Sequence, residues 1–391
     1  MIPAIIPVLA ETLPFALSHY AERRDALIGL MKEREIDVIA LTSTENICYL
    51  TGFGSFAFGR TALVLGTDGV GRWVIRKTEY SNIRALSNQL WVNDGVGVAD
   101  HEDFGAELLS TLRELAAPNA KVGIELDSVQ ASARPFLVLA AGEIPIVNAS
   151  GLVESLRRRK SPEEIKLLRR AGAIAAQACR DGFEALEEGM SDSALGAVVT
   201  NSLILNGSAP VVQFPAVCAG PRTARAHISW RGAPIRRGDI INVEPAASVF
   251  DYHTPIFRIF SMGPPPDEVR RMFDVCRAAL DEGYAEVRPG MTSHEAARIF
   301  ETVIERAGCA EFMVTRPAYS IGLAFAPGWG EDNVVNIRRD NEQILEEGMC
   351  FHVVPCLYRD GIGCVAASMP SLLTRAGFES LSGDEAILLV R

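Results

Sequence analysis

The chain has 391 residues, with 38 Lys and Arg against 49 Asp and Glu, so its formal net charge is −11 at pH 7. This acidic excess argues against binding to nucleic-acid phosphates or to anionic membrane surfaces, both of which attract Lys and Arg. No segment reaches the roughly 20 apolar residues that a membrane-spanning helix needs. We therefore expect no nucleic-acid or membrane partner, and a chain long enough for two domains.

Residues 1–17 are apolar, but no Lys or Arg precedes the apolar run and prolines interrupt it. This composition predicts an arm that packs on the body of the protein or on a partner, rather than a signal peptide. The eight cysteines are scattered, without C-x-x-C or metal-finger spacing. Such a distribution is typical of buried, reduced thiols in a cytoplasmic protein.

Residues 1–155 alternate helical and strand patterns, which predicts a smaller α/β domain. The predicted helices and strands are Tyr20–Glu35 (helix), Ile36–Leu41, Thr61–Leu65 and Arg72–Ile75 (strands), and Phe104–Leu115 (helix). Residues 42–46, between the first two strands, are rich in turn-forming residues.

Residues 156–391 predict a second domain that begins with a long helix over residues 162–186. Ser161 is a suitable N-cap, Pro162 fits the first helical position, and Glu164 completes a capping box. Further helices are predicted at residues 266–288 and 293–307. From residue 211 onward, short strands separated by Gly and Pro turns indicate an α+β domain with a curved antiparallel sheet.

Four motifs occur in an order that resembles the family of creatinase, prolidase and aminopeptidase P. They are residues 46–53 (NICYLTGF), 159–162 (RKSP), 289–292 (PGMT) and 348–358 (GMCFHVVPCLY). Each motif is weak alone, but the ordered set is specific and covers nearly the whole chain. The resemblance implies that the second domain has the pita-bread fold and that the protein is a homodimer.

Metal-using members of this family hold two divalent ions with two Asp, one His and two Glu. The corresponding positions in this sequence are Glu244, Pro255, Tyr319, Val354 and Val365. Pro and Val offer no side-chain ligand, whereas hard cations need clustered carboxylate oxygens. The resemblance therefore predicts that the protein binds no metal and uses no cofactor.

Two lineages of the family are metal-free, creatinase and ectoine hydrolase, and the sequence more closely resembles ectoine hydrolase. The similar stretches are residues 227–230, 252–255, 319–323, 327–331 and 351–352. The sequence departs from that pattern at residues 54–60, which are less aromatic, and in the two arginines before His227. These departures leave open a relative of ectoine as the substrate.

Glu244 is the expected catalytic group, as the base for a water or as a nucleophile on an amidine carbon. A carboxylate pairs well with a planar amidinium, and desolvation raises the pKa of a carboxyl toward neutrality. His227 and His352 are expected to manage protons, the latter because alternation along a strand would place it on the same face as Val354. Tyr319 is expected to polarise and position the substrate. Each of these four groups could instead be a structural side chain satisfied by hydrogen bonds.

Six further residues are candidates for binding the substrate. They are Trp329, Glu331, His253, Phe257, Arg222 and Arg225. An indole face holds a cation, and a guanidinium binds a carboxylate through two hydrogen bonds. The competing interpretations are a purely structural Gly-flanked loop, core packing and solvated surface charges.

These assignments predict a metal-independent hydrolase of a C–N bond in a small cationic or zwitterionic amidine. The first choice of substrate is ectoine, opened to N-acetyl-L-2,4-diaminobutyrate. The alternatives are a creatinase-like amidinohydrolase that releases urea from a guanidino acid, and a non-catalytic protein that binds a small ligand. A peptidase is disfavoured because nothing in the sequence would activate water as two metals do.

Overall fold

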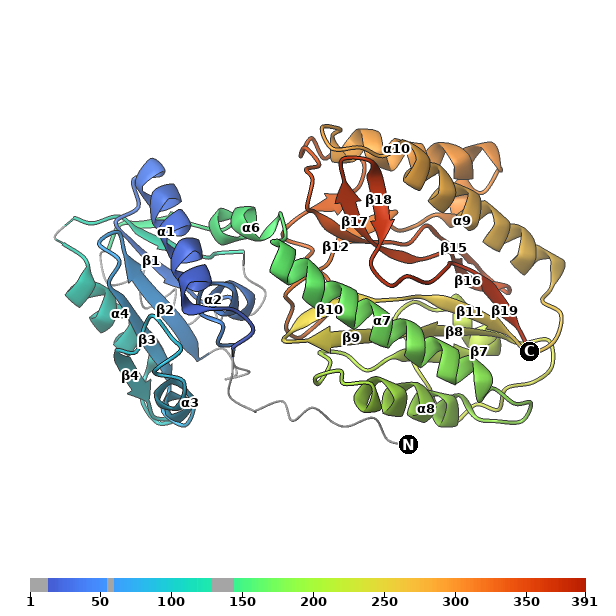
Figure 1. Cartoon of the computed structure of the whole chain (residues 1–391), viewed down its shortest axis with the longest axis horizontal. Helices are drawn as coiled ribbons and strands as arrows, with labels where there is room; N and C mark the ends of the chain where they lie inside the picture. Colours follow the sequence, from blue (N-terminus) through green and yellow to red (C-terminus); the bar gives the residue numbers. More distant parts are fainter. Residues whose placement is uncertain (1–12, 55–59, 118, 128–143) are drawn as a thin grey trace. The chain divides into compact units, whose positions relative to one another are not determined.

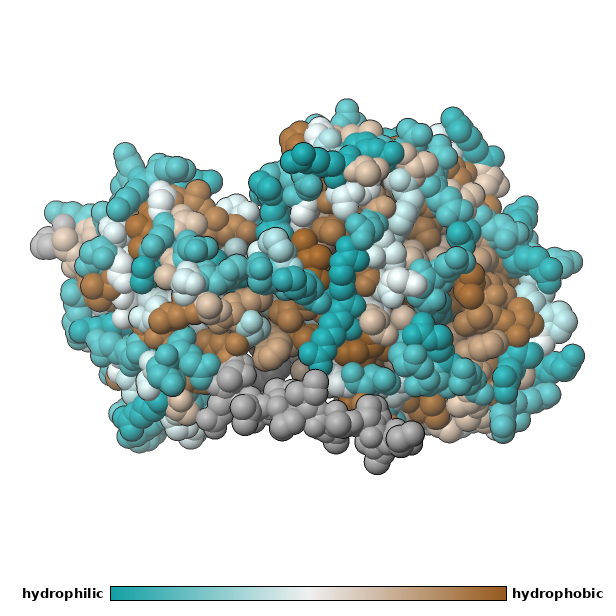
Figure 2. Space-filling view, viewed as in Figure 1, coloured by the Kyte–Doolittle hydropathy of each residue, from teal (hydrophilic) through white to brown (hydrophobic). Residues whose placement is uncertain are grey.

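The computed structural model describes residues 13–54, 60–117, 119–127 and 144–391. The expected N-terminal arm therefore lies largely outside the described residues, as does most of the segment 54–60. The chain forms two compact units with the boundary between Arg157 and Arg158 (Figure 1). Hydrophilic side chains cover most of the face shown in Figure 2, with apolar patches between them. Among the described helices, none combines the length and apolar character needed to cross a membrane.

The N-terminal unit is built on a six-stranded sheet with the order β4-β3-β2-β1-β5-β6. Its strands are β1 Val38–Leu41, β2 Thr61–Gly66, β3 Gly71–Arg76, β4 Gly95–Val98, β5 Val122–Ile124 and β6 Ile146–Asn148. Its helices are α1 Leu17–Glu33, α2 Thr44–Thr51, α3 Tyr80–Ala85, α4 Phe104–Leu115 and α6 Leu152–Arg157. The predicted α/β class is confirmed, but residues 42–46 are not simply a turn. Ser43 accepts a hydrogen bond from the Asn46 amide and so caps α2.

A buried polar network explains why the motif at residues 46–53 begins with Asn. The Asn46 side-chain amide donates to Glu125 at 2.5 Å and to Glu154 at 2.8 Å, and its oxygen accepts from Arg157 at 2.8 Å. Burial, followed by the charge of Glu154, raises the pKa of Glu125 to about 7. Because buried polar groups must be satisfied, Asn46 holds together the start of α2, the end of β5 and helix α6. The motif therefore has a structural role.

The C-terminal unit contains four long helices and a set of short strands. The helices are α7 Pro162–Glu184, α8 Asp192–Leu205, α9 Asp267–Glu286 and α10 Ser293–Arg306. The strands are β7 Ala216–Ala219, β8 Ile240–Glu244, β9 Ala246–Val249, β10 Tyr252–Pro255, β11 Arg258–Ser261, β12 Ala318–Ser320, β13 Asn336–Ile337, β14 Cys350–Val353, β15 Cys356–Arg359, β16 Gly363–Ala366, β17 Met369–Thr374, β18 Gly377–Ser380 and β19 Leu388–Val390. The capping box predicted for Ser161 and Glu164 is present at the start of α7.

The strands of this unit form small sheets that the helices cover. A four-stranded sheet has the order β19-β11-β8-β7 and a five-stranded sheet has the order β13-β12-β14-β17-β18. Their pairings are antiparallel except for β11 with β19. One hydrophobic cluster joins α7 and α8 to β7, β8 and β9, and another joins α9 and α10 to β14–β17. In Figure 1, α9 and α10 lie above these strands, α8 lies below them and α7 runs across them.

Candidate functional site

A cavity of about 280 Å³ opens within the C-terminal unit. The loop after β7, the ends of β7 and β8, strand β12, the loop 328–332 and the β15–β16 hairpin surround it. The lining residues are Gln213, Ala216, Cys218, Thr223, Arg225, Ala226, His227, Ile228, Asn242, Glu244, Phe257, Thr315, Arg316, Tyr319, Gly328, Trp329, Gly330, Asp332, Val354, Cys356, Tyr358 and Cys364. The cavity brings together six of the ten residues singled out from the sequence: Glu244, His227, Tyr319, Trp329, Arg225 and Phe257.

Glu244 is the last residue of β8, where it lies opposite Ala216 of β7. Its carboxylate makes no hydrogen bond or ion pair with any other described residue. Burial raises the pKa of this carboxyl from 4.5 to about 7, because no neighbouring donor stabilises the charged form. A carboxyl that exchanges its proton near neutrality suits general acid–base work.

Tyr319 lies on β12, directly opposite His352 of the neighbouring strand β14. The Tyr319 phenol accepts a hydrogen bond from Trp329 Nε1 at 2.9 Å and lies 2.8 Å from His352 Nδ1. Burial, and secondarily the charge of Glu244, raises the pKa of the Tyr319 phenol, so the phenol stays protonated. The group can therefore donate to a substrate but not act as a base.

The expectation that His352 points into the cavity is wrong. Its imidazole is fully buried behind Tyr319, with Nε2 2.6 Å from the Ser368 hydroxyl. Burial, together with the charges of Arg258 and Arg316, lowers the pKa of His352 to about 3. The alternation argument failed because β14 ends at Val353, one residue before Val354. His352 therefore reaches the cavity only through its contact with Tyr319.

Glu331 does not contact the cavity, contrary to expectation. It shares the loop with Trp329 but turns into the protein, where it pairs with Lys160 at 2.5 Å. Both side chains are about 1% exposed, and the Ser320 hydroxyl also donates to Glu331. Glu331 is therefore an anchor for the loop that presents Trp329.

Arg222 and Arg225 have different environments, although the sequence predicts the same substrate-binding role for both. Arg222 pairs with the buried Asp192 at 2.7 Å and donates to the Ser229 carbonyl, so it is not available for a substrate. Arg225 lies exposed on the cavity wall and makes no side-chain ion pair with another described residue. The neighbouring His227 is also exposed and has a left-handed backbone with a φ of 55°.

His253 is another expected site residue that the structure places elsewhere. Its ring is fully buried, Nδ1 lies 2.8 Å from the Asp251 carbonyl, and burial lowers its pKa to about 4. It does not line the cavity, and neither does Pro255, whose face it was expected to share. His253 is therefore a core histidine in this structure.

The cavity does not offer the donor set of a two-metal centre. Of the five positions compared with the metal-using members, only Glu244, Tyr319 and Val354 line the cavity. Val365 instead pairs with Leu357 and packs in a hydrophobic cluster, because alternation along β16 turns Cys364 to the cavity. Across the described residues, no three His, Cys, Asp or Glu side chains are grouped so that they could hold an ion.

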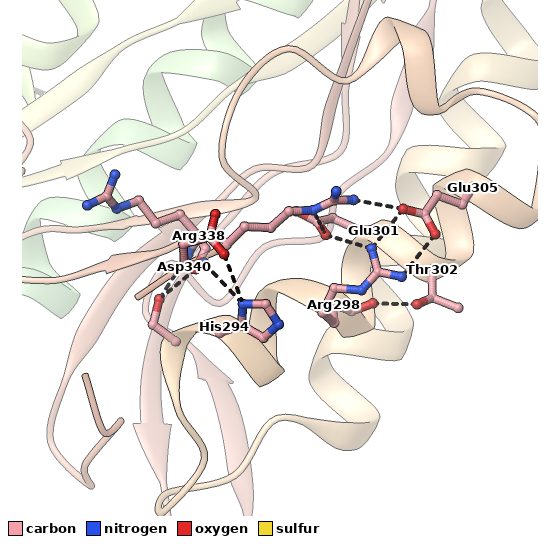
Figure 3. Close-up of polar contacts among 9 residues, drawn as sticks. His294, Arg298, Glu301, Thr302, Glu305, Arg338 and Asp340 are labelled. Atoms are coloured by element: carbon pink, nitrogen blue, oxygen red, sulfur yellow. Dashed lines mark hydrogen bonds and ion pairs between the residues drawn. The ribbon is translucent and has the colours of Figure 1, made fainter. Parts of the chain in front are cut away.

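A second hollow lies along α10, and four charged side chains beside it pair with one another (Figure 3). Arg298 pairs with Glu301 and Glu305, and Arg339 pairs with the same two carboxylates. The His294 ring accepts a hydrogen bond from the Asp340 amide at 3.1 Å. This network fastens residues 338–340 to α10, and it pairs Arg298 and Arg339 with Glu301 and Glu305.

Comparison with known proteins places the chain in a family. Residues 166–372 match the model of metallopeptidase family M24, and residues 23–159 match the creatinase/prolidase N-terminal domain. The chain belongs to family M24. Ectoine hydrolase of Halomonas elongata is 27% identical over 98% of this chain and 100% of its own length. Xaa-Pro dipeptidase of Lactobacillus helveticus is 24% identical over 92% of this chain and 96% of its own length.

Solved structures confirm the fold of this M24 member. A dipeptidase from Pyrococcus horikoshii superposes with a TM-score of 0.82 at 24% identity, covering 94% of this chain and 100% of that one. A prolidase from Thermococcus sibiricus gives 0.84 at 20% identity, with coverage of 95% and 99%. At these identities the likeness shows the pita-bread fold with its N-terminal domain, and the predicted fold class is confirmed.

Three groups at the site were not found from the sequence. Ser368 supports His352 from the loop between β16 and β17, and Arg316 stands 4.9 Å from the centre of the Tyr319 ring. Cys356 and Cys364 bring their sulfur atoms to 3.2 Å on the cavity wall. The eight cysteines are all free and buried, as predicted. Only the pairing of β15 with β16 brings the two thiols together, and the sequence does not reveal that register.

Proposed function

We propose that this M24-family protein hydrolyses a non-peptide C–N bond in a small cationic or zwitterionic amidine without a metal ion, with ectoine or a close relative as the substrate. The observation that carries the proposal is the Glu244 carboxylate, which has no hydrogen-bond partner among the described residues, in a cavity where these residues form no cluster of three metal ligands. A planar amidinium supplies the paired N–H donors that this carboxylate lacks.

The surrounding side chains suit the rest of such a substrate. The Trp329 indole, held by its bond to Tyr319, presents an aromatic surface to a delocalised cation. Arg225 at the cavity wall can receive a carboxylate through two hydrogen bonds. A zwitterion with an amidinium at one end and a carboxylate at the other therefore complements both the carboxylate of Glu244 and the guanidinium of Arg225.

The reaction follows from the pKa of Glu244. A water adds to the amidine carbon while the Glu244 carboxylate takes one of its protons, so a C–O bond forms and one C–N bond becomes single. The same carboxyl, with a pKa of about 7, then returns the proton to the departing nitrogen. The C–N bond breaks as the remaining hydroxyl proton of the added water passes to the departing amine, so the products are an amide and an ammonium and Glu244 ends as it began.

The relatives that match over most of the chain support this choice but also suggest a competing activity, that of a dipeptidase. Ectoine hydrolase matches over 98% of this chain, whereas other relatives are named as Xaa-Pro dipeptidases. A dipeptidase reaction through two metals requires ligands at positions where this chain has Tyr319 and Val354. The side chains at these positions therefore favour metal-free hydrolysis of an amidine over the dipeptidase activity for which other relatives are named.

The test combines metal analysis with a substrate screen. The full-length protein, dialysed against a chelator, should still turn over ectoine or 5-hydroxyectoine, and Glu244→Gln should abolish that turnover. Creatine turnover would support the creatinase-like alternative, and binding without turnover would support a non-catalytic role. Cleavage of a Xaa-Pro dipeptide that is lost on chelation would overturn the proposal.

A further inference from the structure

The hydrogen bonds around His352 fix the direction in which the Tyr319 proton points. Four groups form one chain of contacts: the Phe257 amide, the Ser368 hydroxyl, the His352 ring and the Tyr319 phenol. Each group has a limited number of protons and acceptor sites, so the donors can be assigned in order from one end.

The Ser368 hydroxyl must donate to His352. Its oxygen already accepts from the Phe257 amide at 3.0 Å, and the side chain is fully buried. Among the described residues, His352 Nε2 at 2.6 Å is the one acceptor within its reach. A buried hydroxyl proton without an acceptor is strongly disfavoured, so Ser368 donates and Nε2 accepts.

The His352 ring must then carry its proton on Nδ1. The ring is neutral, because burial and the nearby charges of Arg258 and Arg316 lower its pKa to about 3. A neutral imidazole with an accepting Nε2 has its hydrogen on Nδ1. That hydrogen points at the Tyr319 oxygen, 2.8 Å away.

The Tyr319 oxygen therefore accepts two hydrogen bonds from the protein. Trp329 Nε1 is a donor only, and it contributes the second bond at 2.9 Å. With both lone pairs of the oxygen in use, the phenol proton can point neither at Trp329 nor at His352. We infer that a relay from Ser368 through His352 holds the Tyr319 phenol as a hydrogen-bond donor to the substrate in the cavity.

This inference rests on the proposed function for its chemical role. The nitrogens of a planar amidinium have no free lone pair, so they cannot accept from Tyr319 before the reaction. Once water has added to the carbon, each nitrogen regains a lone pair, and the one nearest the phenol accepts its hydrogen bond. A donor engaged only in the adduct raises the rate without tightening substrate binding. Tyr319 is thus a catalytic residue, and Ser368, His352 and Trp329 are positioning residues.

The direct test is the tautomer of His352 in the full-length protein, and it needs no substrate. Nitrogen chemical shifts of ¹⁵N-histidine-labelled protein distinguish Nδ1–H, Nε2–H and the doubly protonated ring. The chain has six histidines, so His352 is assigned by its loss in His352→Gln or, should that variant not fold, by its displacement in Tyr319→Phe. The Nδ1–H form at pH 7 is expected, and either other form would overturn the inference.

Variants then test the role of each group in catalysis. Tyr319→Phe should lower kcat on ectoine roughly tenfold or more with little change in KM, as for the loss of one transition-state donor. Ser368→Ala should make the Nε2–H form detectable and lower kcat roughly threefold to tenfold, the effect of one hydrogen bond. Ser368→Thr keeps the hydroxyl and should retain both the tautomer and the rate. A tautomer unchanged in Ser368→Ala would refute the relay.

Failure of the proposed function and failure of the relay would give different experimental results. If ectoine is not a substrate but His352 is in the Nδ1–H form, the proposed function fails and the orientation of Tyr319 stands. If ectoine is hydrolysed but His352 is in the Nε2–H form, the function stands and the relay is wrong.

Discussion

Glu244→Gln should make the protein more stable above pH 7 while it removes activity. The folded protein raises the pKa of this carboxyl from 4.5 to about 7. Between these two pH values the folded state keeps a proton that the unfolded state has lost, so the free energy of unfolding falls as pH rises. Below pH 4.5 the carboxyl is protonated in both the folded and the unfolded state, so it no longer changes the free energy of unfolding with pH.

The size of the effect follows from the same two pKa values. A difference of about 2.5 pH units at about 1.4 kcal/mol per unit gives about 3.5 kcal/mol as an upper limit. Because Glu244 faces a cavity that is open to water, we expect about half of this value. A neutral glutamine of similar size should therefore raise the free energy of unfolding by about 1–2 kcal/mol at pH 8 and by nothing measurable at pH 4.5.

The assay is urea unfolding of both proteins at several pH values, followed by tryptophan fluorescence. Other buried acids, such as Glu125, are present in both proteins and cancel in the difference. The matched control is Glu331→Gln, whose carboxylate is paired with Lys160 and whose loss should destabilise the protein at pH 8. If Glu244→Gln also destabilises the protein at pH 8, Glu244 has a partner and the reasoning is refuted.

Four further predictions follow from the site and its supports. With ectoine, kcat/KM should rise about tenfold per pH unit up to about pH 7 and then level off, and a profile that is flat from pH 5.5 would contradict Glu244 as the base. Lys160→Met should lower the free energy of unfolding by about 3–5 kcal/mol in urea titrations, because it removes the cation that is paired with the buried Glu331 carboxylate. Ser161→Ala removes the capping-box hydroxyl and should lower the free energy of unfolding by about 1 kcal/mol in the same assay, without changing kcat. Arg225→Gln should raise KM for a zwitterionic substrate by about tenfold or more but leave KM for an uncharged analogue unchanged, and equal effects on both would exclude a carboxylate contact.

Local signals in the sequence predicted local structure well. The capping box at Ser161 fixed the start of α7, and the helix at residues 104–115 was predicted with its observed bounds. Hydrogen bonds between residues close in the sequence determine where a helix begins and ends, so the local sequence is sufficient to predict these positions. Glu244, which was singled out from the family resemblance, lies in the wall of the cavity.

The errors arose where distant partners decide the role of a side chain. Glu331 is neutralised by Lys160, 171 residues earlier, and Arg222 by Asp192, 30 residues earlier. Strand alternation misplaced His352 because it requires the strand to continue, and β14 stops at Val353. Periodicity describes one segment at a time, whereas ion pairs and strand ends depend on the folded chain.

The left-handed backbone of His227 decides how its role should be probed. A φ of 55° is strained for most residues, whereas Asn and Gly adopt it readily. Replacement by alanine would remove the imidazole and also disfavour the loop conformation that carries Arg225, so one substitution would combine two effects. Asparagine keeps the turn and removes only the ring, which makes it the substitution of choice for asking what this exposed histidine contributes.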